Sequence, residues 1–378
     1  MYSSTPRKKR DASGIDGLSI NDFDDDKDNY ISLLSEKIRS GTYTPMLLRA
    51  APIPKPNNKY RIICIPTVKD RFVQRCILRF LNNHDQTLAN KISYGFINGY
   101  SKAVECAVTK AKSLRQSQSW AYKADISAFF DNIQRAEIEN LIRKKVKYRS
   151  LHNLIIKFVH TEIQADGNLA RIIHQQGISR GLGLRQGMPL SPYLANLYLK
   201  NFDDAVIKKN IKMIRYADDL IAFANNKDSC HQIHDFCKQE LRKVFLDIHD
   251  IDLKSKTIIA APEQDIEFLG LSICPSNSGY EIPISQQQLG KIKTKLYELT
   301  DMNYCLKNGI NLTNIMSKLE SKKIGYMDAY DSAQNKSQLH DLLDNSYRQI
   351  IGQIFFKLGI NIDKLPSQAK KFLGLHLI

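Results

Sequence analysis

The chain has 378 residues and a formal net charge of +16 at pH 7, with a pI near 9.4. This length is enough for two or three sub-domains and a sizeable buried core. The charge indicates a polyanionic partner, because an uncompensated excess of one sign repels itself. No apolar run reaches the roughly 20 residues of a membrane helix, and the polar, basic residues 1–11 do not resemble a signal peptide. Composition therefore excludes a membrane protein, and we expect a soluble, cytoplasmic protein with no membrane partner.

Cysteines and basic residues add two further expectations. The seven cysteines lie far apart, without a Cys-x-x-Cys pair or a histidine set at zinc spacing, which indicates reduced thiols. Basic residues gather in three clusters, which together favour a nucleic-acid track, although any one of them alone is more often a solvated face. The clusters are Arg7-Lys8-Lys9-Arg10, Arg143-Lys144-Lys145 and the group Lys318, Lys322 and Lys323.

In chain order, the first thirty residues are polar and end in an acidic run, which favours a flexible loop or a helix start over a set of metal ligands. The acidic residues are Asp22, Asp24, Asp25, Asp26 and Asp28. Apolar residues spaced by three and four predict helices over 71–81, 103–114, 135–146 and 151–159. Runs of β-branched and aromatic residues predict strands over 120–126, 213–216, 220–224, 257–261 and 266–273.

After the turn-rich residues 275–279 the composition changes to that of a helical tail. Its apolar periodicity predicts three amphipathic helices, over 292–299, 315–326 and 339–358. Strands and helices in this mixed order predict an α+β fold in which an antiparallel sheet is backed by helices.

The most informative motif is Tyr216-Ala217-Asp218-Asp219, which lies between two apolar, strand-like segments. This pattern predicts a hairpin with the acidic pair at its tight turn, where both side chains project toward one point. An Asx-type turn would also explain the hairpin. Two adjacent carboxylates repel each other, however, so a cation is the better reason to keep both. Asp125 is the candidate for a third carboxylate of a two-metal site, which predicts a nucleotidyl-transfer enzyme.

Seven segments together resemble the bacterial reverse transcriptases, a family that includes group II intron, retron and defence-associated enzymes. They follow the family's order from about residue 14 to about residue 272, and an ordered series is far more specific than any one tetrapeptide. The segments are Gly14–Ser19, Ile53–Arg71, Tyr122–Asp131, Arg185–Pro192, Tyr216–Asp219, Leu253–Thr257 and Phe268–Leu271.

This resemblance implies a right-hand polymerase fold and a two-metal mechanism. The N-terminal segment and fingers would occupy residues 1–120, the palm 121–275, with fingers and palm helices at 135–180, and a helical thumb 285–378. Two Mg²⁺ ions about 3.5–4 Å apart would serve the reaction, with Mn²⁺ as a substitute. Asp125 and Asp218 would bridge both ions, the backbone carbonyl of Ile126 would add a ligand, and Asp219 would be an outer or alternate ligand.

Further residues match the family's positions around the incoming nucleotide. Phe130 matches the aromatic steric gate that fills the space of a ribose 2′-hydroxyl, which implies selection of deoxynucleotides. Phe129 and Phe130 are both core candidates, and one of them is expected in the core because neighbouring strand residues face opposite sides. Lys55 and Arg61 match the fingers positions that hold the triphosphate through charge-assisted contacts.

The remaining matches concern the base pair, the leaving group and the primer. Gln186 and Gly187 match the motif that shapes the base-pair pocket and grips the template, where glycine permits a close approach of the backbone to a ligand. Arg185 stands where most relatives have proline, at a position expected to contact the template. Lys256 is similar to the lysine that protonates or stabilises the pyrophosphate, and Phe268-Leu269-Gly270 resembles the primer grip.

The leading hypothesis is an RNA-directed DNA polymerase that makes cDNA from dNTPs on a dedicated, non-coding RNA template. A stand-alone enzyme of this kind resembles antiphage-defence reverse transcriptases, because the Val-Thr-Gly motif of retron enzymes is not found in the predicted thumb. A retron-type enzyme, a maturase-like protein that binds a structured intron RNA, and an RNA-templated RNA polymerase remain as alternatives. Phe130 argues against the last of these, since an RNA polymerase must admit the 2′-hydroxyl.

Overall fold

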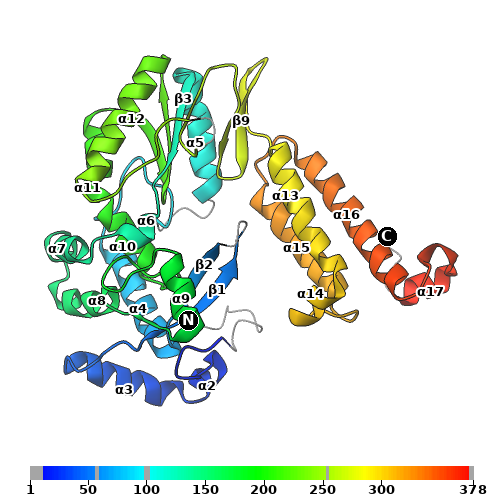
Figure 1. Cartoon of the computed structure of the whole chain (residues 1–378), viewed down its shortest axis with the longest axis horizontal. Helices are drawn as coiled ribbons and strands as arrows, with labels where there is room; N and C mark the ends of the chain where they lie inside the picture. Colours follow the sequence, from blue (N-terminus) through cyan, green and yellow to red (C-terminus); the bar gives the residue numbers. More distant parts are fainter. Residues whose placement is uncertain (1–11, 56–58, 98–102, 253–254, 374–378) are drawn as a thin grey trace. The chain divides into compact units, whose positions relative to one another are not determined.

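The computed structural model describes residues 12–55, 59–97, 103–252 and 255–373, so the basic cluster at residues 7–10 lies outside the described residues. The chain divides into two compact units. Unit 1 contains residues 1–103 and 120–259, and unit 2 contains residues 104–119 and 260–378. Each unit is built from segments that are distant in the sequence (Figure 1).

Unit 1 is organised around a four-stranded sheet with the strand order β5-β6-β3-β7. β3 pairs antiparallel with β6, and β6 pairs antiparallel with β5. The strands are β3 (Trp120–Asp125), β5 (Lys212–Tyr216), β6 (Asp219–Ala224) and β7 (Ile258–Ala260), the last of which ends at the boundary between the units. Five consecutive residues of β6, Leu220 to Ala224, are buried, as expected for a central strand covered on both faces.

One face of this sheet is covered by α12 (Lys227–Arg242), which packs against β3 and β6 (Figure 1). α12 begins at Asn226, whose side chain caps the helix by accepting a hydrogen bond from the Ser229 N–H. Its buried residues recur at helical spacing and form one apolar face toward the sheet. They include Cys230, Ile233, Cys237 and Leu241.

A second, three-stranded sheet in unit 1 has the order β2-β1-β4. β1 (Leu48–Pro54) and β2 (Tyr60–Ile65) form an antiparallel hairpin in which Ile53 pairs with Arg61. β4 (Ile163–Gln164) pairs parallel with β1. The remaining helices of this unit are α2 (Ile20–Asp25), α3 (Lys27–Arg39), α4 (Val68–His84), α6 (Phe129–Asn132), α7 (Arg135–Lys145), α8 (His152–Val159), α9 (Gly167–Gln175), α10 (Ser191–Tyr198) and α11 (Lys200–Lys208).

Unit 2 joins a small sheet to a helical bundle. Its sheet has the order β10-β9-β8, and α5 (Ala103–Ser117) lies beside it (Figure 1). The buried Arg115 of α5 fastens the two together by donating to the carbonyl oxygens of Ile273, at 2.6 Å, and Ala261, at 3.0 Å. The strands are β8 (Ile266–Phe268), β9 (Leu271–Ser276) and β10 (Gly279–Glu281).

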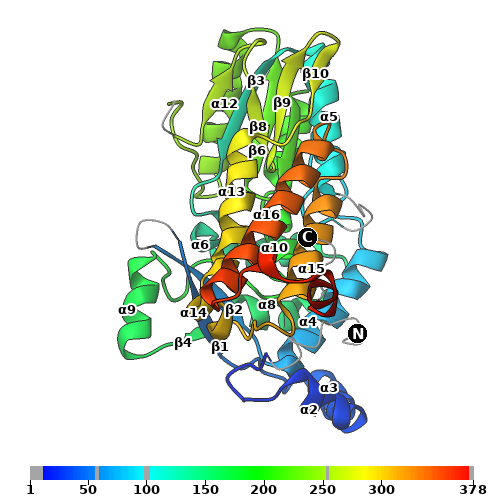
Figure 2. The same ribbon diagram turned by 90° about the vertical axis from the view of Figure 1, so that its right-hand side faces the viewer.

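The bundle of unit 2 is built on α13, α15 and α16, which run side by side (Figure 2). Its helices are α13 (Gln286–Tyr297), α14 (Met302–Lys307), α15 (Ile315–Ala329), α16 (Lys336–Lys357) and α17 (Ser367–Phe372).

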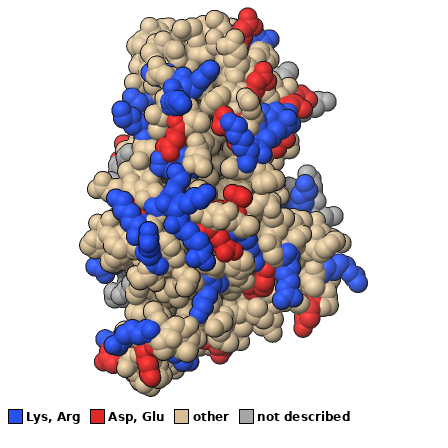
Figure 3. Space-filling model, turned by 90° about the vertical axis from the view of Figure 1, so that its left-hand side faces the viewer, with Lys and Arg blue, Asp and Glu red and all other residues tan. Residues whose placement is uncertain are grey.

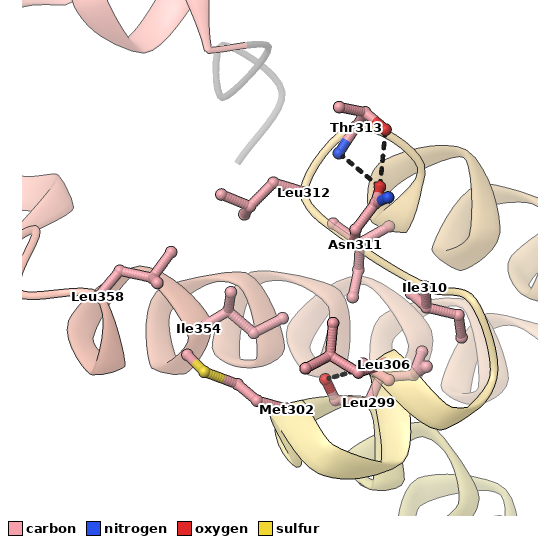
Figure 4. Close-up of a pocket in the computed structure, with 11 residues that line it drawn as sticks. Leu299, Met302, Leu306, Ile310, Asn311, Leu312, Thr313, Ile354 and Leu358 are labelled. Atoms are coloured by element: carbon pink, nitrogen blue, oxygen red, sulfur yellow. Dashed lines mark hydrogen bonds between the residues drawn. The ribbon is translucent and has the colours of Figure 1, made fainter.

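An apolar cavity of about 440 Å³ opens in this bundle (Figure 4). Two of the polar residues that line it bond to each other, since the N–H and hydroxyl of Thr313 both donate to Asn311 Oδ1. Among the described residues, those that line this cavity carry no charge.

The α+β prediction is confirmed, and each helix expected from periodicity is present with shifted ends. The acidic run lies in α2 and at the start of α3, as a helix start, with a capping box between Ser19 and Asp22. Two local predictions are wrong. Residues 266–273 form two strands, because Leu269 and Gly270, with φ of 54° and 82°, turn the chain between them. Phe129 and Phe130 lie in α6 and not in a strand.

The structure also bears on the thiols and on membrane insertion. All seven cysteines are free, in agreement with the expected reduced thiols. Among the helices that the structure describes, none has the length and apolarity needed to cross a membrane.

Candidate functional site

The acidic motif forms the turn between β5 and β6. Tyr216 pairs with Asp219, which leaves Ala217 and Asp218 as the two turn residues. Ala217 has a left-handed backbone, with φ of 57°, as the first residue of a tight hairpin turn requires. Asp219 is the first residue of β6, so the prediction that both carboxylates occupy the turn is wrong for Asp219. The tight hairpin itself is confirmed.

Asp125 joins these carboxylates at the same end of the sheet. It is the last residue of β3 and pairs directly with Asp219 across the β3–β6 ladder. The backbone N–H of the following residue, Ile126, donates to the Asp218 carbonyl oxygen at 3.1 Å. The side chain of Ile126 is buried, so only its backbone faces this site. Asp125 thus meets Asp218 and Asp219, which follow it by 93 and 94 residues in the sequence.

The carboxylates repel one another in this arrangement. Burial raises the pKa of Asp218 to about 6, and the neighbouring Asp125 and Asp219 add to the rise. Burial also raises the pKa of Asp219; Lys123 counteracts this rise, and Asp125 adds to it. A buried acid whose charge is disfavoured by other acids gains from a nearby cation.

Lys256 supplies one positive charge at this place. Its ammonium group forms an ion pair with Asp125 Oδ2, and the Lys256 side chain remains 73% exposed. Burial alone would lower the pKa of Lys256, but the ion pair with Asp125 and the nearby Asp218 and Asp219 raise it overall. The structure therefore brings Lys256 to the carboxylates, as the resemblance implies, although Leu253 and Lys254 of the same motif lie outside the described residues.

The donor set fits a hard divalent ion only in part. Among the described residues, no three His, Cys, Asp or Glu side chains are arranged so that they alone could hold a metal ion. Carboxylate oxygens are nevertheless the ligands that Mg²⁺ prefers, and Mg²⁺ ordinarily keeps water or substrate phosphate oxygens as its remaining ligands. The mutual repulsion at Asp218 is the observation that favours a cation there. The residues present therefore fit an ion that is shared with a bound triphosphate.

A buried ion pair supports the turn of Ala217 and Asp218, and sequence reasoning missed it. Arg215 and Asp203 of α11 are both fully buried, and two parallel hydrogen bonds of 2.7 and 2.6 Å join them. Arg215 Nη1 also donates to the Ala217 carbonyl oxygen at 3.1 Å and to Asn196 Oδ1 at 2.9 Å. The guanidinium thus fixes the strained residue that precedes Asp218. The available signal was a charged residue at the interior of β5, directly after the apolar Met213 and Ile214.

Phe130 lies in α6, just beyond the end of β3. Phe129 is 3% exposed and Phe130 is half-buried, so one of the pair is in the core as expected, but by helical and not by strand geometry. The loop of residues 183–187 packs against the backbone of Phe130. The Leu184 N–H donates to the Phe130 carbonyl oxygen at 2.8 Å, and a Cβ on Gly183 would lie 2.7 Å from the Asp131 carbonyl oxygen.

The same loop contacts the β1–β2 hairpin. The Cys64 N–H donates to the Gln186 carbonyl oxygen at 2.7 Å, and Arg61 Nε donates to Gln186 Oε1 at 3.0 Å. Gly187 has a φ of 109°, and a Cβ there would lie 2.4 Å from the Cys64 carbonyl oxygen. Glycine is therefore required for a close approach to the protein's own backbone, whereas the sequence predicted an approach to a ligand. Arg61 and Gln186 are brought together.

Lys55 lies exposed directly after β1. Burial raises the pKa of Asp131, the residue that follows Phe130, and the charges of Arg185 and Lys55 counteract this rise. Residues 56–58 of the hairpin lie outside the described residues.

Arg185 is buried, which corrects the expectation that it contacts a template. Its side chain is 4% exposed, and Nη2 donates to Glu162 Oε2 at 2.6 Å and to the Ser179 carbonyl oxygen at 2.8 Å. Glu162 also accepts from Arg135 Nη1 at 2.6 Å and from the Gly181 N–H at 2.8 Å. Arg185 therefore serves as an internal anchor of the loop that carries Gln186 and Gly187.

The primer-grip match, Phe268-Leu269-Gly270, belongs to unit 2. Phe268 is fully buried, so its side chain cannot itself contact a primer. Leu269 and Gly270 form the turn between β8 and β9. A Cβ on Gly270 would lie 3.2 Å from the Tyr330 hydroxyl, which accepts a hydrogen bond from Gln288 Nε2 at 2.8 Å. The turn is thus supported by the helical bundle of its own unit.

Basic side chains cover parts of both units. Arg143, Lys144 and Lys145 form the last turn of α7, and Figure 3 shows Lys and Arg side chains gathered over the middle of one face of the molecule. In unit 2, burial, together with the like charges of Lys295 and Lys318, lowers the pKa of Lys322. Such repulsion is relieved when an anion binds.

Comparisons with known proteins identify the family to which the chain belongs. A family model described as "Reverse transcriptase (RNA-dependent DNA polymerase)" matches residues 53–273. The group II intron-encoded protein LtrA of Lactococcus lactis subsp. cremoris is 28% identical over 222 residues, which is 58% of this chain and 34% of LtrA. The Retron Ec83 reverse transcriptase of Escherichia coli is 28% identical over 199 residues, which is 51% of this chain and 58% of that protein.

The chain therefore spans about a third to somewhat over half of the length of these two relatives. Among solved structures, telomerase from Candida albicans, in complex with the TWJ fragment of telomeric RNA, has a TM-score of 0.42 and 12% sequence identity. That match covers 92% of this chain and 68% of the telomerase chain.

Proposed function

Because the chain belongs to the reverse transcriptase family, we propose that it is an RNA-directed DNA polymerase that makes cDNA from a dedicated, non-coding RNA. The observation that carries this proposal is the meeting of Asp125, Asp218 and Asp219 at one end of the β3–β6–β5 sheet. The family's right-hand polymerase fold agrees with the mixed sheet and helices described above. We further propose that the protein works in the cytoplasm in antiphage defence, in the manner of the defence-associated reverse transcriptases that it resembles.

The reaction joins a primer 3′-hydroxyl to the α-phosphate of a dNTP and releases pyrophosphate. The family generally uses divalent ions. Such ions neutralise charge at the phosphate and lower the pKa of the attacking hydroxyl. Mg²⁺, with Mn²⁺ as a substitute, would be held here by Asp125 and Asp218. Asp219 pairs with Asp125 across the sheet and would serve as an outer or alternate ligand, and the backbone carbonyl of Ile126 would add an oxygen.

Other residues act on the nucleotide and its leaving group. Lys55 and Arg61, on the β1–β2 hairpin, would bind the triphosphate oxygens through charge-assisted hydrogen bonds. Gln186 holds the Arg61 guanidinium in place, and Gly187 brings the loop of residues 183–187, which would be the base-pair loop, against β2. Lys256 would stabilise or protonate the pyrophosphate, since its ammonium group already lies at the carboxylates.

Replacement of Phe130 by Ala is expected to relax discrimination against ribonucleotides. The half-buried ring would no longer occupy the space of a 2′-hydroxyl, so the ratio of kcat/KM for dNTPs to that for rNTPs should fall by about 10- to 100-fold. Primer-extension kinetics with matched dNTP and rNTP pairs measure this ratio. Phe130→Tyr keeps a ring at this position and should retain the selectivity. An unchanged ratio in the Ala variant would refute the gate assignment.

One alternative is favoured by a specific observation. The similarity to a group II intron-encoded protein supports an RNA-binding maturase-like role, in which the main task is to hold a structured RNA. An RNA-templated RNA polymerase would use the same carboxylates, but the placement of Phe130 beside the base-pair loop counts against it.

Sequencing of the nucleic acids that co-purify with the native protein tests the proposal. The wild type should carry one abundant RNA together with complementary DNA. The Asp125→Asn, Asp218→Asn variant should carry the RNA alone, because RNA binding does not need the carboxylates. The same RNA in both preparations, with DNA in neither even after infection by phage, would favour the maturase-like role.

A further inference from the structure

Phe96 is an exposed aromatic residue beside the catalytic turn, and none of the roles described above uses it. Its side chain is 50% exposed. The centroid of its ring lies 6.3 Å from that of Tyr216, and the two ring planes are inclined by 47°. Tyr216 directly precedes the turn residues Ala217 and Asp218. An exposed aromatic side chain therefore lies beside the residue that leads into this turn.

The backbone that leads to Phe96 is fixed to this turn. The Arg215 N–H donates to the Ile92 carbonyl oxygen at 2.7 Å, and the Tyr94 N–H donates to the Arg215 carbonyl oxygen at 2.9 Å. Gly95 packs so closely that a Cβ there would lie 2.7 Å from the Ala217 nitrogen. Residues 92–95 thus extend the sheet beyond β5 and position Phe96 rigidly.

The buried polar network of the turn reaches the same segment. Asn196 Nδ2 donates to the Gly95 carbonyl oxygen at 2.8 Å, and Asn196 Oδ1 accepts from Arg215 Nη1 at 2.9 Å. The Arg215 guanidinium therefore bonds directly to the Ala217 carbonyl and is linked to the Gly95 carbonyl through Asn196. Phe96 and Asp218 are held by one set of hydrogen bonds.

The conformation of Phe96 is itself unusual. Its φ of 60° is in the left-handed region, which residues with a side chain adopt at a cost in free energy, and such residues cluster at ligand clamps. Burial of the ring would offset this cost, but half of the side chain remains exposed. Contact with a ligand would offset it instead.

We propose that Phe96 is a stacking platform for a nucleobase of the primer–template held at the catalytic turn. The inference rests on the proposed function, because it assumes that nucleic acid is bound beside Asp218. An aromatic ring suits this task, since it can stack on the face of any base and a polymerase must accept all of them. The nucleobase can come from the template strand or from the primer strand.

Equilibrium binding of a DNA primer annealed to an RNA template, measured by fluorescence anisotropy, tests the proposal. Phe96→Ala should raise Kd by about 5- to 100-fold, as expected for the loss of a stacked base. Phe96→Trp should bind as tightly as the wild type. Phe245→Ala is the matched control, because Phe245 is also an exposed phenylalanine, at 64%, with a left-handed φ of 59°. Equal affinity of Phe96→Ala and wild type, or an equal loss in both Ala variants, would overturn the proposal.

An abasic nucleotide placed at successive positions of either strand identifies the source of the base. At one position the abasic nucleotide should weaken the binding of wild type. At that same position it should not weaken the binding of Phe96→Ala below the affinity of this variant for the intact hybrid. The strand that contains this position is the source. If the two proteins respond alike at every position of both strands, Phe96 does not stack on a base.

The outcomes separate this inference from the proposed function. If wild type extends no primer but Phe96→Ala still binds the hybrid more weakly, the polymerase assignment fails and the stacking site stands. If wild type extends primers and Phe96→Ala binds them normally, only the stacking site fails.

Discussion

Replacement of Asp218 by Asn is expected to lower the rate of cDNA synthesis by about a thousandfold or more, because it removes a charged ligand from a reaction that depends on charge neutralisation. The amide is similar in size to the carboxylate, so the turn should keep its backbone. Single-turnover primer extension at saturating dNTP measures the rate. Asp228→Asn, an exposed acid in the first turn of α12, is the control and should retain full activity. Activity within about tenfold of wild type in the Asp218 variant would refute its role as a ligand.

The same substitution is expected to stabilise the metal-free protein at neutral pH. Burial and the neighbouring acids raise the pKa of Asp218 from its ordinary 3.8 to about 6. Its ionisation therefore disfavours the folded state, and wild type should lose stability as the pH rises from about 4 through about 6. Asn does not ionise, so the variant should not share this loss. Urea unfolding in EDTA at pH 4 and pH 7 measures both effects, and equal pH dependence in the two proteins would contradict the repulsion.

Replacement of Arg215 by Ala is expected to lower the free energy of unfolding by about 3–5 kcal/mol, because it leaves the fully buried Asp203 without its partner. The double variant Arg215→Met, Asp203→Leu removes both charges and should cost much less. Urea denaturation measures both costs. Asp204→Ala is the matched control on the same helix, since it breaks the more exposed Lys200–Asp204 pair and should cost less than about 1 kcal/mol.

Activity separates the structural role of Arg215 from its positioning role. The double variant is expected to fold but to lose cDNA synthesis, because nothing then donates from this position to the Ala217 carbonyl oxygen. Full activity in a folded double variant would show that the ion pair serves stability alone. A double variant as unstable as Arg215→Ala would contradict the account of an unpaired buried charge.

The strands and the acidic turn could be predicted because their signals are local. Alternating or continuous apolar runs define β3, β5 and β6, and the adjacent acids between two strands define the hairpin. The series of family motifs located Asp125 and Lys256 for the same reason, since each motif is short and ordered. The assigned roles of these residues stay predictions until the variants are measured.

The buried arginines could not be predicted in the same way. Arg115, Arg185 and Arg215 look like surface residues in sequence, and each is buried only because acceptors from distant segments surround it. For Arg185 the acceptor is Glu162, 23 residues earlier, and for Arg115 it includes the carbonyl of Ile273, 158 residues later. Such pairs depend on tertiary structure, and neither periodicity nor propensity encodes them. The turn of Leu269 and Gly270 between β8 and β9 could not be predicted either, because the sequence Phe-Leu-Gly-Leu continues the apolar pattern of a single strand.

The division of the chain has a consequence for its modularity. Because α5 belongs to unit 2 but lies between two segments of unit 1, the chain passes from one unit to the other at residues 103–104, 119–120 and 259–260. No single cut releases the helical bundle with its sheet intact, since a fragment that starts at residue 260 leaves out Arg115 and its bonds to β9. A bundle taken from residue 260 onward is therefore expected to lack the contacts that Arg115 makes with its sheet. A chimaera must carry α5 along, together with the connection that leads directly into the strand bearing Asp125.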